Sequence, residues 1–222
     1  MKTLILVPSR PELEQLLAPL PEPLSSCPWP VYPWGKDCFW ALCGIGPAAA
    51  AFSSGELIRG LAPERVILAG IGGAFRQSGL EPGDLVQASS ECFADLGYRD
   101  GARFYNLDHM KLDMLPLRER ALGCHWPLHL LDNRRSRHSF LTVSSITNSV
   151  ERAEALRATF GAGVENMEGA AVAMACSVHG IACSQIRAVS NWVGPRNPSV
   201  WKTREPLARL RLWLEELLAT PM

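Results

Sequence analysis

The sequence predicts a three-layer α/β/α sandwich, in which helices cover both faces of a mixed, twisted central sheet. Apolar runs of strand length alternate with helical patterns along the whole chain, which is typical of this fold class. The 222 residues suit one large α/β domain, and 47% hydrophobic residues provide a substantial core. Because no repeat or low-complexity linker divides the chain, residues 1–222 are predicted to form a single domain.

The first half of the chain contains four expected strands and two expected helices. The largely apolar run Thr3–Val7 predicts a strand, and Pro11 begins a helix whose leucines share one face. Residues 19–36 are rich in Pro and Trp, so we expect a surface excursion there. Small residues predict a helix over Ala48–Gly60. Further strands are expected at Cys38–Cys43, Arg65–Ala69 and Leu85–Ser89.

The second half is regular only in its last part. Residues 98–137 are poorly patterned and loop-rich, with one helix expected near 114–121. Met167–Val178 consists almost entirely of Met, Ala, Val, Gly and Cys, which predicts a buried helix. Lys202–Leu218 has the leucine spacing of an amphipathic helix. The remaining expected elements are strands at Phe140–Ser144, Ala162–Val164 and Ile181–Val193 and a helix at Val150–Thr159.

The charge balance argues against polyanionic partners. The chain carries 22 basic and 22 acidic residues, so it has no general attraction for nucleic acid or an anionic membrane. The basic cluster at 134–138 is short and is expected to be a solvated loop. No apolar run approaches the roughly 20 residues of a membrane span, and Leu4–Val7 is too short for a signal peptide. We therefore expect neither a nucleic-acid partner nor membrane insertion.

The cysteines and histidines predict a reducing compartment and no metal site. The seven cysteines are odd in number and contain no Cys-x-x-Cys pair, and several lie within apolar runs. They are therefore expected to be reduced core residues of a cytoplasmic protein. The five histidines are scattered singly, without the spacing of metal ligands.

Two polar residues at the ends of apolar elements are the first candidates for a functional site. Glu168 lies at the start of the expected buried helix, where a carboxylate is costly unless something hydrogen-bonds it. Backbone amides at the helix start or a ligand hydroxyl would satisfy it, and the ligand is favoured because the following turns are so apolar. Asn191 ends a hydrophobic strand, where it forms a turn or contacts a ligand as both donor and acceptor.

Two further features are ambiguous on their own. Gly70-Ile71-Gly72-Gly73 follows a strand and forms either a tight turn or a close approach of backbone to ligand. It matches neither a dinucleotide-binding fingerprint nor a P-loop. Glu12 lies in the first turn of the first helix, where the helix dipole favours a carboxylate whatever its role. Glu14 is two residues further along and competes for any role given to Glu12.

Six segments, in order along nearly the whole chain, together carry a family resemblance. They are Gly44-Ile45-Gly46-Pro47, Gly70-Ile71-Gly72-Gly73, Gly83-Asp84-Leu85-Val86, Val143-Ser144, Met167-Glu168-Gly169-Ala170-Ala171 and Arg187-Ala188-Val189-Ser190-Asn191. The sequence resembles the purine nucleoside phosphorylase and nucleosidase superfamily in these segments. Within this superfamily the sequence resembles the futalosine hydrolases in four places, which are Val164–Gly169, Ala94–Gly97, Ser190–Asn197 and Trp201.

The resemblance implies hydrolysis of the N-ribosidic bond of futalosine, which gives hypoxanthine and dehypoxanthinyl futalosine in menaquinone biosynthesis. It implies that Glu12 activates water, that Glu168 binds the ribose hydroxyls and stabilises an oxocarbenium-like transition state, and that Asn191 holds the purine. It further implies no metal or organic cofactor, a small-molecule nucleoside substrate and a homodimer or higher homo-oligomer. The other implied substrate contacts are Met167, Asn166, Gly72, Gly73, Thr147 and Asn148.

The identity of residue 191 decides between purines. Methylthioadenosine/adenosylhomocysteine nucleosidases carry Asp there, which accepts a proton from the 6-amino group of adenine. Asn191 can instead donate to a 6-oxo group and accept from a protonated nitrogen 7, which favours hypoxanthine. The phosphate-binding segments of the phosphorylases are only partly matched, by Arg10, so water is favoured as nucleophile. An adenine-releasing nucleosidase, a phosphorylase and a non-catalytic nucleoside-binding protein remain the alternatives.

Overall fold

The computed structural model describes residues 1–24, 29–101, 103–117, 121–133, 135–195 and 197–219. The helices are α1 (Arg10–Leu16), α2 (Pro47–Leu61), α3 (Val150–Phe160), α4 (Gly169–His179) and α5 (Arg204–Ala219), with 3-10 turns at Arg76–Ser78 and Pro198–Val200. The main sheet comprises β1 (Thr3–Val7), β2 (Val31–Trp34), β3 (Cys38–Leu42), β4 (Arg65–Ala74), β5 (Leu85–Phe93), β10 (His125–Pro127), β11 (Arg137–Thr142), β12 (Val164–Asn166) and β13 (Ala182–Trp192). Two small separate ladders are formed by β6 (Gly97–Asp100) with β7 (Arg103–Asn106) and by β8 (Leu115–Pro116) with β9 (Ala121–Leu122).

The main sheet is mixed and partly closed. Its strand order is β10-β5-β11-β12-β4-β1-β3-β2, and β13 pairs with both β4 and β5. The strands β4, β12, β11, β5 and β13 therefore form a ring, because each pairs with two others of the set. Within the ring three pairs are parallel, but β12 is antiparallel to β4 and β13 is antiparallel to β5; outside it β10 is antiparallel to β5 and β2 to β3.

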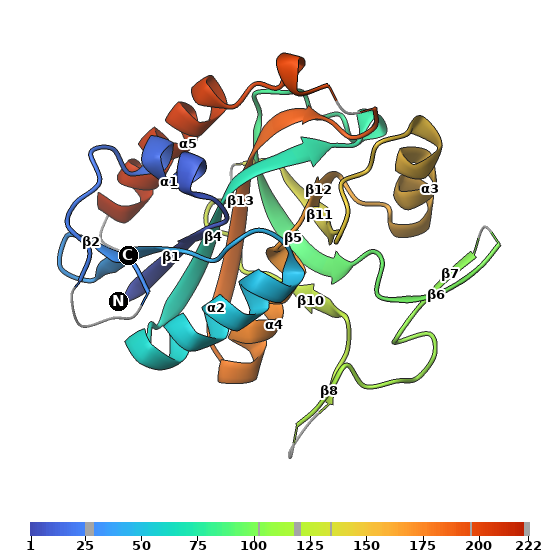
Figure 1. Ribbon diagram of the computed structural model, residues 1–222, viewed down its shortest axis with the longest axis horizontal. Coiled ribbons are helices and arrows are strands. Elements are labelled where there is room, and N and C mark those ends of the chain that lie inside the picture. The colour runs from blue at the N-terminus through green and yellow to red at the C-terminus, as the bar shows by residue number, and fades with distance from the viewer. Residues whose placement is uncertain (25–28, 102, 118–120, 134, 196, 220–222) are drawn as a thin grey trace.

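Helices cover the sheet on both faces (Figure 1). On one face α2 packs against α4, and on the other α1 packs against α5. One apolar core lies beneath α2 and α4, and a second lies beneath α1 and α5. This arrangement confirms the predicted α/β/α fold with a mixed central sheet, while the closure of five strands into a ring was not predicted.

The buried helix and the first strand form as the sequence predicts. All five residues of β1 are buried, because helices cover both faces of the sheet around it. Most residues of α4 are buried on every side, as expected from its apolar composition. The helix ends at Gly180, whose left-handed backbone (φ 68°) closes the last turn.

Three predictions about elements are corrected. No helix lies near 114–121 in the described residues, since Leu115–Pro116 pairs with Ala121–Leu122 as short strands; residues 118–120 lie outside the described part. Within 19–36, Val31–Trp34 forms a strand whose first two residues are buried. The strand expected at Arg65–Ala69 continues to Ala74, so Gly70–Gly73 is extended backbone and not a tight turn.

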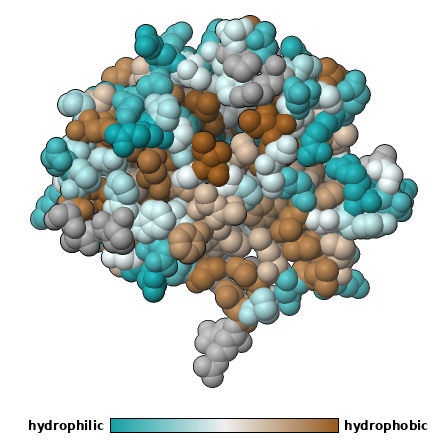
Figure 2. All heavy atoms as spheres, in the orientation of Figure 1, coloured by the Kyte–Doolittle hydropathy of each residue, from teal (hydrophilic) through white to brown (hydrophobic). Residues whose placement is uncertain are grey.

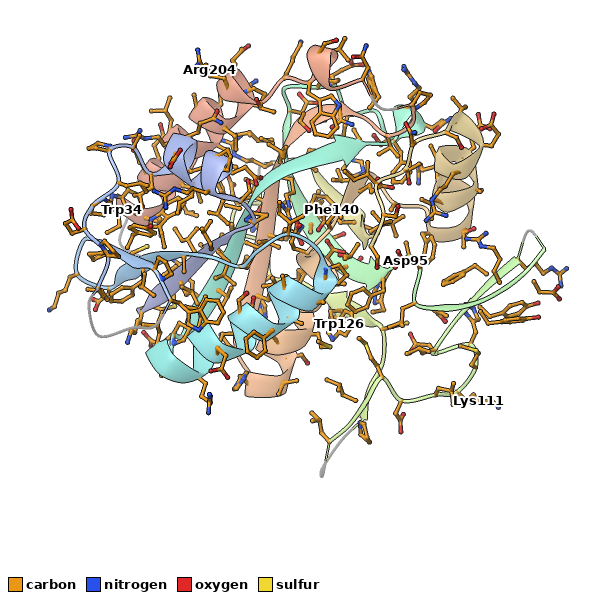
Figure 3. The ribbon with its side chains drawn as sticks, viewed as in Figure 1. Trp34, Asp95, Lys111, Trp126, Phe140 and Arg204 are labelled. Atoms are coloured by element: carbon orange, nitrogen blue, oxygen red, sulfur yellow. The ribbon has the colours of Figure 1, made fainter. Side chains whose placement is uncertain are left out.

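The ladders β6–β7 and β8–β9 belong to an arm that projects from the body of the molecule (Figure 1). Figure 3 shows Lys111 on this arm, whereas Phe140 lies inside the body and is 1% exposed. Six cysteines of the described residues are free, and Cys27 lies outside that part of the chain. Among the helices that the structure describes, none has the length and apolarity to cross a bilayer.

Candidate active site

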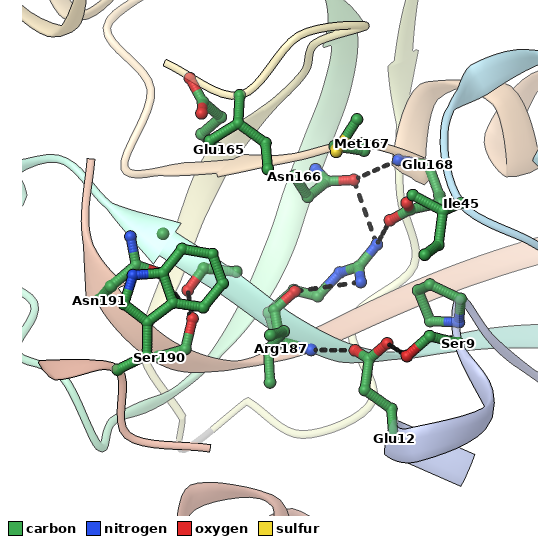
Figure 4. Close-up of a pocket in the computed structure, with 16 residues that line it drawn as sticks. Ser9, Glu12, Ile45, Glu165, Asn166, Met167, Glu168, Arg187, Ser190 and Asn191 are labelled. Carbon is green, nitrogen blue, oxygen red and sulfur yellow. Dashed lines mark hydrogen bonds and ion pairs between the residues drawn. The ribbon is translucent and has the colours of Figure 1, made fainter. Parts of the chain in front are cut away.

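A cavity of about 220 Å³ opens where β4, β12 and β13 end beside the start of α1 (Figure 4). Most of the polar residues that the sequence analysis selected lie around it. Its lining comprises Pro8, Ser9, Glu12, Ile45, Ile71, Gly72, Gly73, Ile146, Glu165, Asn166, Met167, Glu168, Arg187, Ser190, Asn191 and Trp201.

Glu12 faces the cavity, and Glu14 does not. The carboxylate of Glu12 is 7% exposed and accepts hydrogen bonds from the backbone N–H of Ile71 at 2.8 Å and from the hydroxyl of Ser9. Glu14 points to solvent and forms an ion pair with Arg10 at 2.8 Å. The helical turn that begins at Arg10 thus separates the two acids, because residues two apart on a helix do not share a face.

Glu168 and Arg187 form a buried ion pair at the same end of the cavity as Glu12 (Figure 4). Glu168 Oε2 lies 3.1 Å from Arg187 Nη2, and both side chains are at most 5% exposed. Glu168 Oε1 accepts from the backbone N–H of Gly46 at 3.1 Å, and Arg187 Nη1 donates to the carbonyl of Ile71 at 3.2 Å. The Nε–H of Arg187 has no hydrogen-bond partner among the described residues.

The glycines of β4 make room for these charged groups. A Cβ on Gly70 would lie 2.6 Å from Glu12 Oε1 and 2.9 Å from Arg187 Nη1, which is too close for either contact. A Cβ on Gly72 would lie 2.8 Å from a methyl carbon of Val164. The glycine run therefore serves close packing around the site, and Gly72 and Gly73 line the cavity as predicted.

Asn191 reaches the cavity through an irregularity in β13. The register with β4 shifts between Val189 and Asn191, so Ser190 is an extra residue in the strand. Asn191 Oδ1 accepts from the hydroxyl of Ser190 at 2.7 Å, and its Nδ2 donates to the carbonyl of Trp192 at 2.8 Å. Each end of the amide retains one further hydrogen-bonding position for a ligand.

Two predicted substrate contacts, Thr147 and Asn148, are placed differently from the expectation. Asn166 lines the cavity, but its amide is engaged within the protein, with its oxygen accepting from the backbone N–H of Glu168 and Gly169 and from Arg187. Thr147 is bound to Glu165 through its backbone N–H at 3.0 Å and its hydroxyl at 2.5 Å. Thr147 and Asn148 are absent from the cavity lining within the described residues, where their neighbour Ile146 lies instead. Met167 does line the cavity.

The mouth of the cavity is apolar. Ile45, Ile146 and Trp201 line it, and Ile45 and Ile146 are 62% and 40% exposed. Figure 2 shows apolar side chains gathered on the face of the molecule that carries α2 and α4. Substituents that leave the cavity through this mouth therefore meet hydrocarbon and indole surfaces.

Burial sets the electrostatics of the site. Desolvation raises the pKa of the Glu12 carboxyl, while the hydrogen bonds from Ser9 and Ile71 and the charge of Arg187 lower it in part. Two carboxylates, Glu12 and Glu168, thus share one buried guanidinium. An uncharged or cationic group is electrostatically favoured in the space between them, and a second anion is disfavoured.

Several site residues were not singled out from the sequence. Arg187, Ser190, Ile45 and Glu165 were quoted only as parts of motifs, and Ser9 and Ile146 were not considered. Arg187 carried a usable signal, since a charge inside the apolar run Ile186–Val189 is costly unless it is paired. The others carried none, because only the folded chain brings them to the same cavity.

Comparison with known proteins agrees with this geometry. The family model described as the phosphorylase superfamily matches residues 24–219. The futalosine hydrolase of Thermus thermophilus is 33% identical over 183 residues, covering 79% of each chain. The futalosine hydrolase of Streptomyces coelicolor is 35% identical over 181 residues, covering 75% of this chain and 72% of the relative.

Solved structures show the same fold at lower identity. The native futalosine hydrolase of Helicobacter pylori superposes with a TM-score of 0.78 at 18% identity, covering 98% of this chain and 97% of that one. A variant of the Helicobacter pylori methylthioadenosine/adenosylhomocysteine nucleosidase, solved with 5'-methylthioadenosine in its active site, gives a TM-score of 0.80 at 18% identity with the same coverage. On the family model and on the curated relatives, the chain belongs to the phosphorylase superfamily.

Proposed function

We propose that this chain is a futalosine hydrolase, which cleaves the N-ribosidic bond of futalosine with water and releases hypoxanthine. The observation that carries the proposal is the cavity with Glu12 and Glu168 at one end and Asn191 at the other. The similarity to two curated futalosine hydrolases over most of the chain supports the choice of substrate.

Glu12 is the proposed base for the attacking water. Its two oxygens are held by Ser9 and Ile71, so the carboxylate is fixed before the substrate arrives. Its raised pKa brings it closer to neutrality, where a general base is most effective. Glu14, which is ion-paired at the surface, is not proposed for this role.

Glu168 and Met167 are proposed to hold the ribose. Glu168 is negatively charged at a site that excludes most water, so it stabilises the positive charge that develops on the sugar as the bond breaks. Arg187 holds one oxygen of this carboxylate, and the backbone of Gly46 holds the other. The ribose hydroxyls then bind to the remaining acceptor positions of a fixed group.

Asn191 is proposed to read the purine. Its oxygen already accepts from Ser190 and has a second lone pair for a protonated nitrogen 7. Its nitrogen already donates to Trp192 and has a second N–H for the 6-oxo group. Protonation of nitrogen 7 makes hypoxanthine a better leaving group.

Water is favoured over phosphate as the nucleophile. Arg187 is the cation in the described lining of the cavity, and it is already paired with Glu168 and bonded to the carbonyl of Ile71. A phosphate beside Glu12 and Glu168 would face two carboxylates without a free cation. A neutral water meets no such repulsion.

A purine-release assay tests the proposal. Purified protein should release hypoxanthine from futalosine at the same rate with and without phosphate. Inosine and methylthioadenosine serve as comparison substrates. Preferential release of adenine from methylthioadenosine would identify the nucleosidase alternative, and a strict need for phosphate would identify a phosphorylase. Binding without turnover of any of the three would identify a nucleoside-binding protein.

We also propose that the chain forms a homodimer through the face that carries α2. Ile45 and Phe52 are 62% and 65% exposed there, and Trp29 packs edge-on against Phe52 with ring centroids 6.0 Å apart. A second copy would remove this apolar surface from water. Sedimentation equilibrium should give twice the monomer mass, and Phe52→Glu should give the monomer mass.

A further inference from the structure

A second buried acid, Glu91, lies behind the wall of the cavity and takes no part in the proposed chemistry. It lies on β5 and is 0% exposed. Its carboxylate accepts from the hydroxyl of Thr142 at 3.1 Å and from Nδ2 of Asn166. A fully buried carboxylate costs free energy unless its contacts offset that cost, so its presence calls for an explanation.

Glu91 determines which end of the Asn166 amide faces the site. The two N–H groups of Asn166 are used by Glu91 and by the carbonyl of Leu141 at 3.0 Å. The amide oxygen is thereby turned to the other side, where it accepts from Glu168 N at 2.9 Å, Gly169 N at 2.7 Å and Arg187 Nη2 at 3.1 Å. The reverse orientation would oppose the NH₂ group to three donors.

The contacts of the Asn166 amide oxygen also fix the position of Glu168. Arg187 Nη2 bonds both Asn166 Oδ1 and Glu168 Oε2, each at 3.1 Å. The backbone of Glu168 is also bound to the Asn166 oxygen. Both the main chain and the side chain of Glu168 are thus held through the amide that Glu91 orients.

Gly169 shows how closely Glu91 lies beneath the start of α4. A Cβ at residue 169 would lie 1.8 Å from Glu91 Oε1, so only glycine fits between the helix and the carboxylate. The N-terminus of a helix favours a negative charge or an acceptor at this place. The glycine of the Met-Glu-Gly segment is therefore explained by Glu91 and not by the substrate.

We propose that Glu91 is a positioning residue for the reaction: by accepting from Asn166 it fixes the amide, and through it Arg187 and Glu168, in the arrangement that the ribose requires. The proposal rests on the proposed function for its kinetic measurement. What Asn166 needs is an acceptor oxygen at this position. A glutamine can supply that oxygen, and an apolar side chain of equal length cannot.

Kinetics of three variants test this role. Glu91→Met removes the acceptor, and should lower kcat for hypoxanthine release by about 10-fold to 100-fold while KM changes by less than about threefold, as expected for a displaced catalytic group. Glu91→Gln should restore kcat to within about threefold of the wild type, because it supplies the acceptor. If Glu91→Met does not fold, Glu91→Asp replaces it in the test. The shorter side chain keeps the charge but moves the carboxylate away from Asn166 by the length of one methylene, so its kcat should fall well below that of Glu91→Gln.

Gln87 provides a matched control on the same strand. It is 1% exposed and makes three hydrogen bonds, to the backbone of Leu131 and Asp132, away from the site. Gln87→Met should lower the melting temperature as Glu91→Met does, yet leave kcat of the folded protein unchanged.

The outcomes separate the possible errors. A normal kcat in Glu91→Met, an equal loss of kcat in Gln87→Met, or a Glu91→Gln variant as slow as Glu91→Met would each overturn the positioning role. If the wild type does not act on futalosine, the proposed function fails, and the same variants are compared on whichever nucleoside it does cleave. Crystal structures provide a measure that is independent of activity: in Glu91→Met the 3.1 Å contact between Arg187 Nη2 and Glu168 Oε2 should lengthen beyond 4 Å, and an unchanged contact would contradict the proposal.

Discussion

The two ends of the cavity differ in charge and in unused hydrogen-bonding capacity. At one end Glu12, Glu168 and Arg187 are buried charged groups: Arg187 pairs with Glu168, and Glu12 and Arg187 both bind the backbone of Ile71. At the other end Asn191 and Ser190 are neutral, and the amide of Asn191 keeps one donor and one acceptor for a ligand. The first end is suited to stabilise charge on a ribosyl group whatever base it carries, and the second end is suited to distinguish bases.

This difference gives the two ends different expected effects on kinetics. Groups that face developing charge contribute mainly to the transition state, so their loss lowers turnover for every substrate. Groups that face a fixed pattern of donors and acceptors contribute to discrimination, so their exchange changes the ratio between substrates. A variant at one end that showed the kinetic effect expected of the other end would contradict this contrast.

Glu12→Gln should have the largest effect. Loss of a positioned general base lowers kcat by about 10²–10⁴ on all nucleoside substrates, and the fold should stay intact because the amide keeps an acceptor for Ile71. Steady-state purine release measures kcat, and circular dichroism checks the fold. Glu14→Gln is the control and should be near normal, since Glu14 is half-exposed and paired with Arg10. A slow Glu14→Gln beside a normal Glu12→Gln would assign the base to the other glutamate.

Glu168→Gln should have the next largest effect, again on all substrates. The amide keeps the shape but removes the charge that faces the oxocarbenium, so kcat should fall by about 10²–10³ with little change in affinity. Substrate affinity is measured separately by calorimetry with a non-hydrolysed nucleoside. An insoluble or unfolded Glu168→Gln would instead mean that the carboxylate mainly satisfies the start of α4 and its partner Arg187.

Glu91, the buried acid behind the charged end of the cavity, should make the free energy of unfolding depend on pH. Burial raises the pKa of Glu91 to about 7, above the value near 4.3 of an unfolded glutamate. The folded protein therefore favours the protonated form of Glu91. The stabilisation that this form provides is complete below about pH 4, and about 3 kcal/mol of unfolding free energy is lost as the pH rises through 7. Relative to the wild type, Glu91→Gln should gain unfolding free energy between pH 5 and 8. Urea titrations at several pH values measure this difference, and a constant difference would contradict it.

The sequence was sufficient for the fold class, and it was insufficient for the contacts between residues that only the closed ring of strands brings together. The apolar surroundings of Glu168 singled it out as a candidate, because a charge in such a run needs a partner, and the structure pairs it with Arg187 in the cavity lining. The sequence left a tight turn and a close approach of backbone to ligand open at Gly70–Gly73, because glycine permits both a turn and an extended strand, and the structure has the extended strand packed against charged groups. The partners of Asn166 could not be predicted, since Glu91 and Arg187 are distant in sequence and meet it only through the strand ring.

The smallest predicted effect is on the choice of base, at the neutral end of the cavity. Asn191→Asp replaces the free N–H by a carboxylate oxygen, which repels the 6-oxo group of hypoxanthine and accepts from the 6-amino group of adenine. The ratio of kcat/KM for methylthioadenosine to that for futalosine should rise at least about tenfold, or roughly 1.4 kcal/mol of differential transition-state binding. Absolute adenine release can remain low, because the apolar mouth still selects the remainder of the substrate. Ser190→Ala is a useful comparison, since it removes one partner of Asn191 without changing the donor pattern toward the base. An unchanged ratio in Asn191→Asp would mean that Asn191 does not contact the base, and the division of the cavity into a charged end and a discriminating end would be wrong.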